Sequence, residues 1–322
     1  MTAEFQPAVV GRVSVIMVTY NSAHIVKQSL VDLPPAPLVE VIVVDNKSSD
    51  LSVETVLSAR PDAVVIRNEE NAGFAKAVNL GAARATGEYL LLLNPDAVIN
   101  ASALKSLVES MSSNSAIGII APLVTDSTGE FSTIAAGFFP TIIKMGLHAS
   151  GISRLGKWCP ALEGHYLFRS SRLSRSRDLD WVSGGCLLVR RHIWNSLDGL
   201  SERWFMYAED IELCLRVRRA GYKVVLDPSA QAIHEIGSSS HEVQGRANPT
   251  WVVNLFDLYC RDLARNEVSK SAWRWTVIAG FRGRAAAYNL LRILRPSDGT
   301  KHQAQIERYR IFSAALQKTP RT

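Results

Sequence analysis

One buried strand that ends in a proline and an aspartate constrains this chain most. Tyr89 and four consecutive leucines precede Asn94, Pro95 and Asp96. A continuous apolar run of this length, bounded by turn residues, is typical of a strand buried on both faces of a parallel sheet. Pro95 lacks a backbone N–H, so the strand ends there. The sequence therefore predicts that Asp96 lies at the carboxyl edge of such a sheet, where open α/β sheets bind ligands.

Asp96 has two interpretations at this edge. A carboxylate there suits a divalent cation that also contacts a diphosphate, because Mg²⁺ and Mn²⁺ prefer oxygen ligands and keep water and phosphate in their coordination shell. Alternatively, Asp96 caps the helix expected to begin near Ala101, or it closes a turn. The tripeptide alone leaves both interpretations open.

The first hundred residues alternate between apolar, β-rich runs and helical segments. Crossovers of this length predict a doubly wound α/β sheet with parallel strands. Thr19, Asp45 and Asp96 each follow or end a strand, and three polar strand ends at one edge indicate a nucleotide-binding crevice. The expected strands are 13–19, 39–45, 63–67 and 90–93, and the expected helices are about 23–33, 51–59 and 71–86.

Several common sites are missing from the sequence. No G-x-G-x-x-G follows the first strand and no G-x-x-x-x-G-K-[ST] occurs, which argues against a dinucleotide-dependent enzyme and a P-loop phosphotransferase. The four cysteines form no C-x-x-C pair, so we expect neither a zinc site nor a disulfide framework. The first ten residues do not resemble a signal peptide and no run of eighteen apolar residues occurs, so we expect a cytoplasmic protein without a spanning helix.

A second informative stretch covers residues 205–221. Its apolar spacing predicts a helix that ends at Gly221 and carries Glu209 and Asp210 at its N-terminus. The helix dipole favours carboxylates there, so simple capping is one interpretation. The other is a general base that is ionised near neutral pH and reaches an acceptor hydroxyl. His234 alone is most often a packed polar residue, but near Asp96 it would complete a cation site.

The segment between these two stretches gives no clear pattern. Residues 137–179 are either a solvated loop or a mobile, basic, acceptor-side loop that contacts phosphate. Gly184 and Gly185 then lead a strand over 181–190, where they permit close approach of a ligand or form a β-bulge. The basic residues of the unclear segment are Arg154, Lys157, Arg169, Arg172, Arg175 and Arg177.

Positive charge is concentrated at the C-terminal end. The chain has a net charge of +6, and residues 261–322 contain 13 Lys and Arg against four Asp and Glu. This asymmetry indicates an anionic partner. Residues 251–295 have a helical pattern in which Trp, Phe and Leu alternate with Arg, which fits helices lying on an anionic membrane. RNA binding gives the same charge signature without a recognisable RNA module here, and helices packed on the catalytic domain are the third interpretation.

Seven segments together resemble the inverting family 2 glycosyltransferases of the GT-A fold. They cover about residues 11–240 in the order that the family has. The N-P-D and F-M-Y-x-E-D forms are most similar to bacterial rhamnosyltransferases, which build cell-wall linkers, O-antigens and capsules on polyprenyl-diphosphate carriers. The segments are VIMVTYN (15–21), VVDNKSSD (43–50), NAGFAKAVN (71–79), NPD (94–96), WVSGG (181–185), FMYAED (205–210) and His234.

The resemblance implies a role for each matching residue. Asp45 would accept the ring N–H of uracil or thymine, Asp96 and His234 would bind Mg²⁺ or Mn²⁺ on the diphosphate, and Asp210 would deprotonate the acceptor for inverting, in-line attack. Asn94 stands where many relatives carry an aspartate and would contact ribose or the cation more weakly. The implied donor-binding residues are Thr19, Asn21, Asp45, Asn71, Gly73, Lys76, Asn94 and Asp96, and those on the acceptor side are Trp181, Gly184, Gly185 and Glu209.

We therefore expect an inverting hexosyltransferase with a GT-A domain over residues 11–245 and a basic helical extension over 246–322. The best-fitting donor is dTDP-rhamnose. The expected acceptor is a polyprenyl-diphosphate-linked or other glycan hydroxyl at the inner face of the cell membrane, and we expect no nucleic-acid partner. Transfer from another nucleotide sugar (galactofuranosyl or N-acetylglucosaminyl) and a non-catalytic nucleotide-sugar-binding protein of the same fold are the alternatives.

Overall fold

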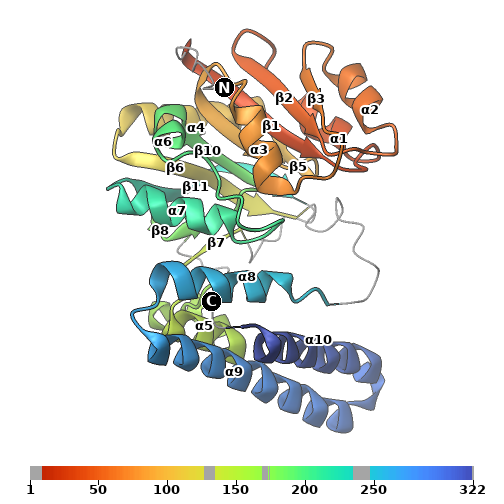
Figure 1. Cartoon of the computed structure of the whole chain (residues 1–322), viewed down its shortest axis with the longest axis vertical. Helices are drawn as coiled ribbons and strands as arrows, with labels where there is room; N and C mark the ends of the chain where they lie inside the picture. Colours follow the sequence, from red (N-terminus) through yellow and green to blue (C-terminus); the bar gives the residue numbers. More distant parts are fainter. Residues whose placement is uncertain (1–8, 127–134, 169–172, 174, 235–246, 321–322) are drawn as a thin grey trace. The chain divides into compact units, whose positions relative to one another are not determined.

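The chain forms two compact units (Figure 1). A computed structural model describes residues 9–126, 135–168, 173, 175–234 and 247–320. Met1–Ala136 and Ser171–Ser240 make up the first unit, and Gly137–Ser170 and His241–Thr322 make up the second. These units reflect packing, and packing does not measure which segments fold independently. The expected domains, 11–245 and 246–322, therefore stay a prediction.

One mixed β-sheet forms the centre of the first unit (Figure 1). Its strand order is β3-β2-β1-β4-β10-β6-β11-β5, with β8 paired to β11. The first four strands run parallel, as predicted, while β10 runs antiparallel to both β4 and β6. The strands are β1 (Val9–Thr19), β2 (Val39–Asp45), β3 (Val64–Arg67), β4 (Gly87–Leu93), β5 (Ala97–Ile99), β6 (Ile117–Thr125), β8 (Arg177–Leu179), β10 (Cys186–Arg190) and β11 (Lys223–His234).

Strand β4 is buried as the apolar run predicts. Tyr89 and Leu90–Leu93 are each at most 2% exposed, because β1 and β10 pair with its two edges and both faces are packed. Thr19 pairs with Asp45 at the ends of β1 and β2, and Leu93 pairs with Cys186 at the start of β10. The carboxyl ends of β1, β2 and β4 therefore share one edge with the turn that precedes β10.

Helices connect these strands, and some are shorter than expected. Helix α3 covers 74–82 of the expected 71–86: residues 71–73 have no regular structure, 83–84 form a turn, and Gly87 already belongs to β4. Asn100 caps α4: its Oδ1 accepts the Ala103 N–H at 2.8 Å. The residue that caps α4 is therefore Asn100 and not Asp96. The helices are α1 (Val26–Val31), α2 (Ser52–Ala59), α3 (Phe74–Ala82), α4 (Ala101–Ser113), α6 (Arg191–Ser196) and α7 (Glu209–Arg219).

One strand prediction needs correction. Residues 181–190 are two strands separated by the Gly184-Gly185 turn: β9 (Trp181–Val182), which pairs with β7 (Ala136–Gly137), and β10. Strand β11 has an irregularity of register after Asp227 and continues to His234. At this irregularity Asp227 Oδ1 accepts hydrogen bonds from the Ser229 N–H and hydroxyl.

The second unit is helical, which corrects the loop expected over 137–179. Helix α9 packs along α5 and α10 (Figure 1). Arg169 and Arg172 of the expected loop lie outside the described residues. Among the helices that the structure describes, none is long and apolar enough to cross a membrane. The elements are α5 (Ile142–Ser150), the 3₁₀ turns η1 (Ile152–Lys157) and η2 (Pro160–Leu162), α8 (Thr250–Leu258), the π-helical turn η3 (Tyr259–Leu263), α9 (Glu267–Leu294), the 3₁₀ turn η4 (Pro296–Asp298) and α10 (Gly299–Lys318).

Most aromatic side chains of residues 251–295 form the core of this unit. Trp273 and Phe281 are at most 1% exposed. The Trp273 indole N–H donates to the Pro140 carbonyl at 2.6 Å, and its ring stacks on Tyr259 with centroids 5.7 Å apart. Trp275, by contrast, is 52% exposed. Most of these rings are therefore unavailable to a membrane, and contact of this unit with an anionic membrane stays a prediction.

Candidate active site

Asp45, at the end of β2, is a buried hydrogen-bond acceptor. Its carboxylate accepts the Thr19 hydroxyl at 2.9 Å, the Ser48 N–H at 2.9 Å and the Ser48 hydroxyl at 2.5 Å. A carboxylate offers about four acceptor positions, so these contacts leave one for a donor N–H. Sequence reasoning missed Ser48, although its place three residues after Asp45 is a common spacing for turn hydrogen bonds.

Asn21 and Asn71 shape the loops around Asp45. Asn21 Oδ1 accepts the Ser49 N–H at 2.8 Å, which joins the end of β1 to the turn after β2. Asn71 Oδ1 accepts the Gly73 N–H at 3.1 Å. Asn21 Oδ1 also accepts the Ser49 hydroxyl at 3.1 Å. The described hydrogen bonds of both side chains therefore hold these loops, and their contact with a donor stays a prediction.

Gly73 allows the loop before α7 to rest on the start of α3. Its φ is +84°, and a Cβ there would lie 2.5 Å from the Phe205 carbonyl oxygen. The same carbonyl accepts the Phe74 N–H at 2.9 Å. A side chain at position 73 would be strained and would also push this loop away. Gly73 therefore contributes through its backbone conformation, which lets the two segments pack together.

Asp96 and His234 meet at the sheet edge although 138 residues separate them in sequence. Asp96 is 4% exposed, and its Oδ1 lies 3.0 Å from His234 Nε2. Adjacent ligands of an octahedral cation, with metal–ligand distances of about 2.1 Å, are about 3 Å apart, so the pair fits one edge of a Mg²⁺ or Mn²⁺ site. Within the described ranges no third His, Cys, Asp or Glu joins them, so a cation would take its other ligands from phosphate and water.

Gly185 packs directly against this pair. A Cβ on Gly185 would lie 2.6 Å from His234 Cε1 and 3.4 Å from Asn94 Nδ2. The Gly185 carbonyl accepts the Asn94 N–H at 2.9 Å, which ties the end of β4 to the turn before β10. Gly185 therefore brings Asn94, Asp96 and His234 together because it has no side chain.

Asp210 lies at the other side of the same turn. Its Oδ2 accepts the Gly184 N–H at 2.9 Å, and its Oδ1 accepts the N–H of Ile211 at 2.8 Å. Burial nevertheless raises the pKa of Asp210 above its ordinary value, more than these hydrogen bonds lower it. The sequence pointed to the helix dipole and its N–H groups as stabilising the ionised carboxylate, and desolvation outweighs them.

Glu209 is buried beside Asp210. Burial, followed by the Asp210 charge, raises the pKa of Glu209 to about 8. Its Oε2 has no hydrogen-bond partner in the described part of the chain. The preceding residues Tyr207 and Ala208 have φ of +75° and +84°, a conformation that costs non-glycine residues of order 1 kcal/mol or more each. Such strain is common at functional sites, and the residue types gave no signal for it.

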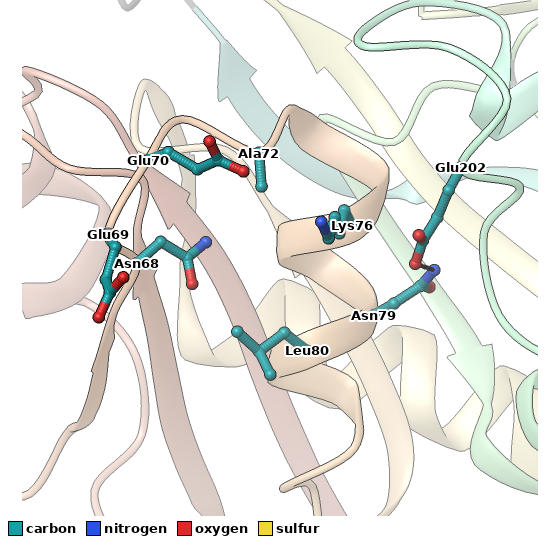
Figure 2. Close-up of a pocket in the computed structure, with 8 residues that line it drawn as sticks. All are labelled: Asn68, Glu69, Glu70, Ala72, Lys76, Asn79, Leu80 and Glu202. Carbon is teal, nitrogen blue, oxygen red and sulfur yellow. Dashed lines mark hydrogen bonds between the residues drawn. The ribbon is translucent and has the colours of Figure 1, made fainter.

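Trp181 is buried, and Lys76 lines a pocket beside α3. Trp181 is 2% exposed, so its acceptor-side role stays a prediction. Lys76 lines a pocket of about 340 Å³ beside α3, together with Glu69, Glu70 and Glu202 (Figure 2). None of the strand-end residues lines this pocket. Three carboxylates against one lysine would repel a diphosphate in this pocket, and the donor-binding role of Lys76 stays a prediction.

A family model agrees with this geometry. Residues 14–177 match the model described as Glycosyl transferase family 2. The chain belongs to this glycosyltransferase family. It is 30% identical over 240 residues to the N-acetylglucosaminyl-diphospho-decaprenol L-rhamnosyltransferase of Mycobacterium tuberculosis, an alignment that covers 70% of this chain and 76% of the relative. Rhamnosyltransferase WbbL of Escherichia coli is 24% identical over 156 residues, covering 47% of this chain and 53% of WbbL.

Solved structures show the same fold. The mannosyltransferase PcManGT from Pyrobaculum calidifontis, in complex with GDP-Man and Mn²⁺, matches with a TM-score of 0.59 and 18% identity over 97% of this chain and 89% of that one. TarS of S. aureus, residues 1–349 with UDP-GlcNAc, matches with a TM-score of 0.52 and 17% identity over 95% and 92% of the two chains. The predicted GT-A fold and the predicted enzyme class, a glycosyltransferase, are confirmed.

Replacing Gly185 tests the contact with His234. Gly185→Ala places a methyl group 2.6 Å from the His234 ring, so we expect the ring to move. The rate of glycosyl transfer should fall at least about tenfold, because an ångström-scale displacement at an active site lowers the rate by this factor or more. Gly283→Ala is the matched control, since a Cβ there would lie more than 4 Å from every neighbouring atom. Equal activities of the two variants would contradict the arrangement.

Glu209→Gln tests whether the buried Glu209 carboxyl keeps a proton in the folded state. Because the folded-state pKa of Glu209 is raised to about 8, the folded state keeps a proton that the unfolded state has released, and the free energy of unfolding falls as pH rises from about 4.5 to about 8. We expect the variant to lose less stability over this window. At about 1.4 kcal/mol per pKa unit the difference is several kcal/mol at most. Urea denaturation across this pH range measures it, and parallel pH profiles would contradict the assignment.

Proposed function

We propose that this glycosyltransferase moves L-rhamnose from dTDP-rhamnose to a hydroxyl of a lipid-linked or polysaccharide acceptor in cell-envelope glycan synthesis. The observation that carries the proposal is the Gly184-Gly185 turn, which contacts the Asp210 carboxylate on one side and the His234 ring beside Asp96 on the other. A proton acceptor and a candidate diphosphate site thus lie next to each other. The name of the M. tuberculosis relative supports the sugar and a lipid-diphosphate acceptor.

Asp45 is the residue that we assign to the base of the donor. Its remaining acceptor position suits the ring N–H of thymine or uracil, and the Thr19 and Ser48 hydrogen bonds hold the carboxylate in place for it. A base without such an N–H would leave a buried acceptor unpaired, which costs about 1–3 kcal/mol. This preference favours bases that carry a ring N–H, namely thymine, uracil and guanine, over adenine and cytosine, and it does not distinguish among the three.

Asp96 and His234 are the residues that we assign to a divalent cation on the donor diphosphate. Their separation of 3.0 Å fits neighbouring ligands of an octahedral ion. When bound, Mg²⁺ or Mn²⁺ would stabilise the negative charge of the departing nucleoside diphosphate. The structure of PcManGT, which contains Mn²⁺ with GDP-Man, supports a cation of this kind in this fold.

Asp210 is the general base in this proposal. Its carboxylate takes the proton of the acceptor hydroxyl as the acceptor oxygen forms a bond to the anomeric carbon. The bond from that carbon to the diphosphate oxygen breaks, dTDP leaves with the bonding electrons, and one displacement inverts the configuration. The raised pKa of Asp210 makes its ionised form a stronger base, while the Gly184 and Ile211 N–H groups orient it.

Asp210→Asn is the experiment that tests this function. The amide keeps the size of the side chain but cannot take a proton, so we expect transfer from dTDP-rhamnose to fall at least about a hundredfold while binding of the donor is retained. Asp32→Asn, the same change at an exposed position, serves as the control. Initial rates and calorimetric binding of dTDP-rhamnose measure the two effects. Unchanged turnover in Asp210→Asn would refute the base assignment, and absence of transfer from dTDP-rhamnose by the unaltered enzyme would refute the donor.

A further inference from the structure

The 3₁₀ turn η1 of the second unit exposes a line of apolar side chains. A 3₁₀ helix has three residues per turn, so residues three apart lie above one another. Ile152 and Leu155 within η1 and Trp158, the residue that follows it, have this spacing and are 45%, 46% and 68% exposed. Three large apolar side chains in one line on a short surface turn are unusual for a chain that does not contact a partner there.

The other two lines of η1 differ sharply from the first. Ser153 and Gly156 are buried, and a Cβ on Gly156 would lie 3.0 Å from Glu163, so this side fixes η1 to its own unit. Arg154 and Lys157 form the third line and are exposed. The turn thus presents one apolar and one basic line outward, as interfacial membrane elements do.

One further arginine lies at the start of η1. The Arg284 guanidinium, from α9, packs 4.3 Å above the Tyr309 ring and donates to the His148 carbonyl at 3.4 Å. Gly151 immediately precedes η1, and a Cβ on it would lie 3.5 Å from Arg284 Nε. Arg308, one residue before Tyr309 on α10, lies with its guanidinium 5.6 Å from the centroid of the Phe312 ring. Arginines from three elements that are distant in sequence thus lie near enough to His148 for their charges to act on it.

The charges at this place are unbalanced. Arg154, Arg284 and Arg308 each act on His148, whose pKa is lowered well below its ordinary value by burial first and by these positive charges in addition. In the described part of the chain none of the three arginines forms an ion pair with a carboxylate. An anion that reached them would find three guanidinium groups whose donors are suited to phosphate oxygens.

We propose that this region, which we call the η1 surface, binds the face of an anionic lipid bilayer: Ile152, Leu155 and Trp158 enter the interface, and Arg154, Arg284 and Arg308 bind lipid phosphate groups. This inference deepens the proposed function, because a lipid-linked acceptor requires an enzyme that reaches the membrane. It also moves the membrane contact away from the aromatic residues of 251–295, most of which are buried. A nucleic acid would supply phosphate but no apolar phase for the three side chains of the apolar line.

Binding of the full-length chain to vesicles tests the surface. We expect the chain to float with vesicles that contain phosphatidylglycerol and not with vesicles of phosphatidylcholine alone. A basic residue near an anionic surface changes binding by about fivefold, so Arg154→Gln with Arg308→Gln should weaken the partition coefficient by about twenty-fivefold. Trp158→Ala should weaken it by about tenfold.

Matched controls distinguish binding through the η1 surface from attraction by the positive charge of the whole chain. Arg282→Gln with Arg310→Gln removes the same charge from exposed positions on α9 and α10, and Trp275→Ala removes another exposed tryptophan. These controls should lose no more than about twofold. The inference would be overturned if the two arginine pairs weakened vesicle binding equally, or if the two tryptophan variants did. It would also be overturned if the unaltered chain did not bind anionic vesicles.

A second assay distinguishes this inference from the proposed function. Transfer of rhamnose to a water-soluble, short-chain diphosphate acceptor needs no membrane, so η1-surface variants should retain it. Vesicle binding with the expected variant pattern but no transfer from dTDP-rhamnose would refute the proposed function and leave the η1 surface standing. Transfer to the soluble acceptor without any vesicle binding would refute the η1 surface and leave the function standing.

Discussion

The hydrogen bond from the Asn94 amide to the Gly185 carbonyl, 2.9 Å long, sets the geometry on which the candidate site depends. It joins the end of the buried strand β4 to the turn before β10, the antiparallel strand inserted between β4 and β6. The turn can lie there because Gly185 has no side chain to collide with His234. Through this one contact, residues near positions 95, 185, 210 and 234 come to a single edge of the sheet.

Two buried aspartates at this edge have different surroundings. Asp45 accepts hydrogen bonds from Thr19 and Ser48 and is held rigidly as an acceptor. Asp210 accepts two backbone N–H groups, yet burial raises its pKa. A fixed acceptor suits recognition of a base, whereas a carboxylate with a raised pKa suits proton transfer. The environment therefore divides the proposed roles between chemically identical side chains.

The sequence predicted those parts of the fold that depend on local pattern. The apolar run before Pro95 correctly predicted a strand with Asp96 just beyond it, and the alternation over the first hundred residues correctly predicted the parallel strands β1 to β4. The antiparallel placement of β10 was not predictable, because strand direction is decided by packing between segments a hundred residues apart. The helices within 137–168 were missed because they are short, so each gives too few residues to establish a period.

The site was predictable to the extent that it consists of short motifs. The pairing of Asp96 with His234 was expected from the resemblance, and the structure places Asp96 Oδ1 3.0 Å from His234 Nε2. The raised pKa of Asp210 was not expected, because the sequence shows a helix N-terminus but not how much water the fold removes. The exposed line of η1 was hidden for a related reason. Ile152, Leu155 and Trp158 follow a three-residue period that occurs in few elements and resembles loop sequence when it is short.

The central claim is that Asp96 and His234 hold a cation on the diphosphate of a dTDP-sugar. Thermal unfolding of the chain with dTDP-rhamnose, UDP-galactose, UDP-N-acetylglucosamine and GDP-mannose, each with and without Mn²⁺, tests it most directly. A donor at a hundredfold its Kd stabilises the folded state by about 2.7 kcal/mol. The account predicts stabilisation by dTDP-rhamnose that requires Mn²⁺ and is lost in Asp96→Asn. Stabilisation that is equal without Mn²⁺, or that survives in Asp96→Asn, would contradict it.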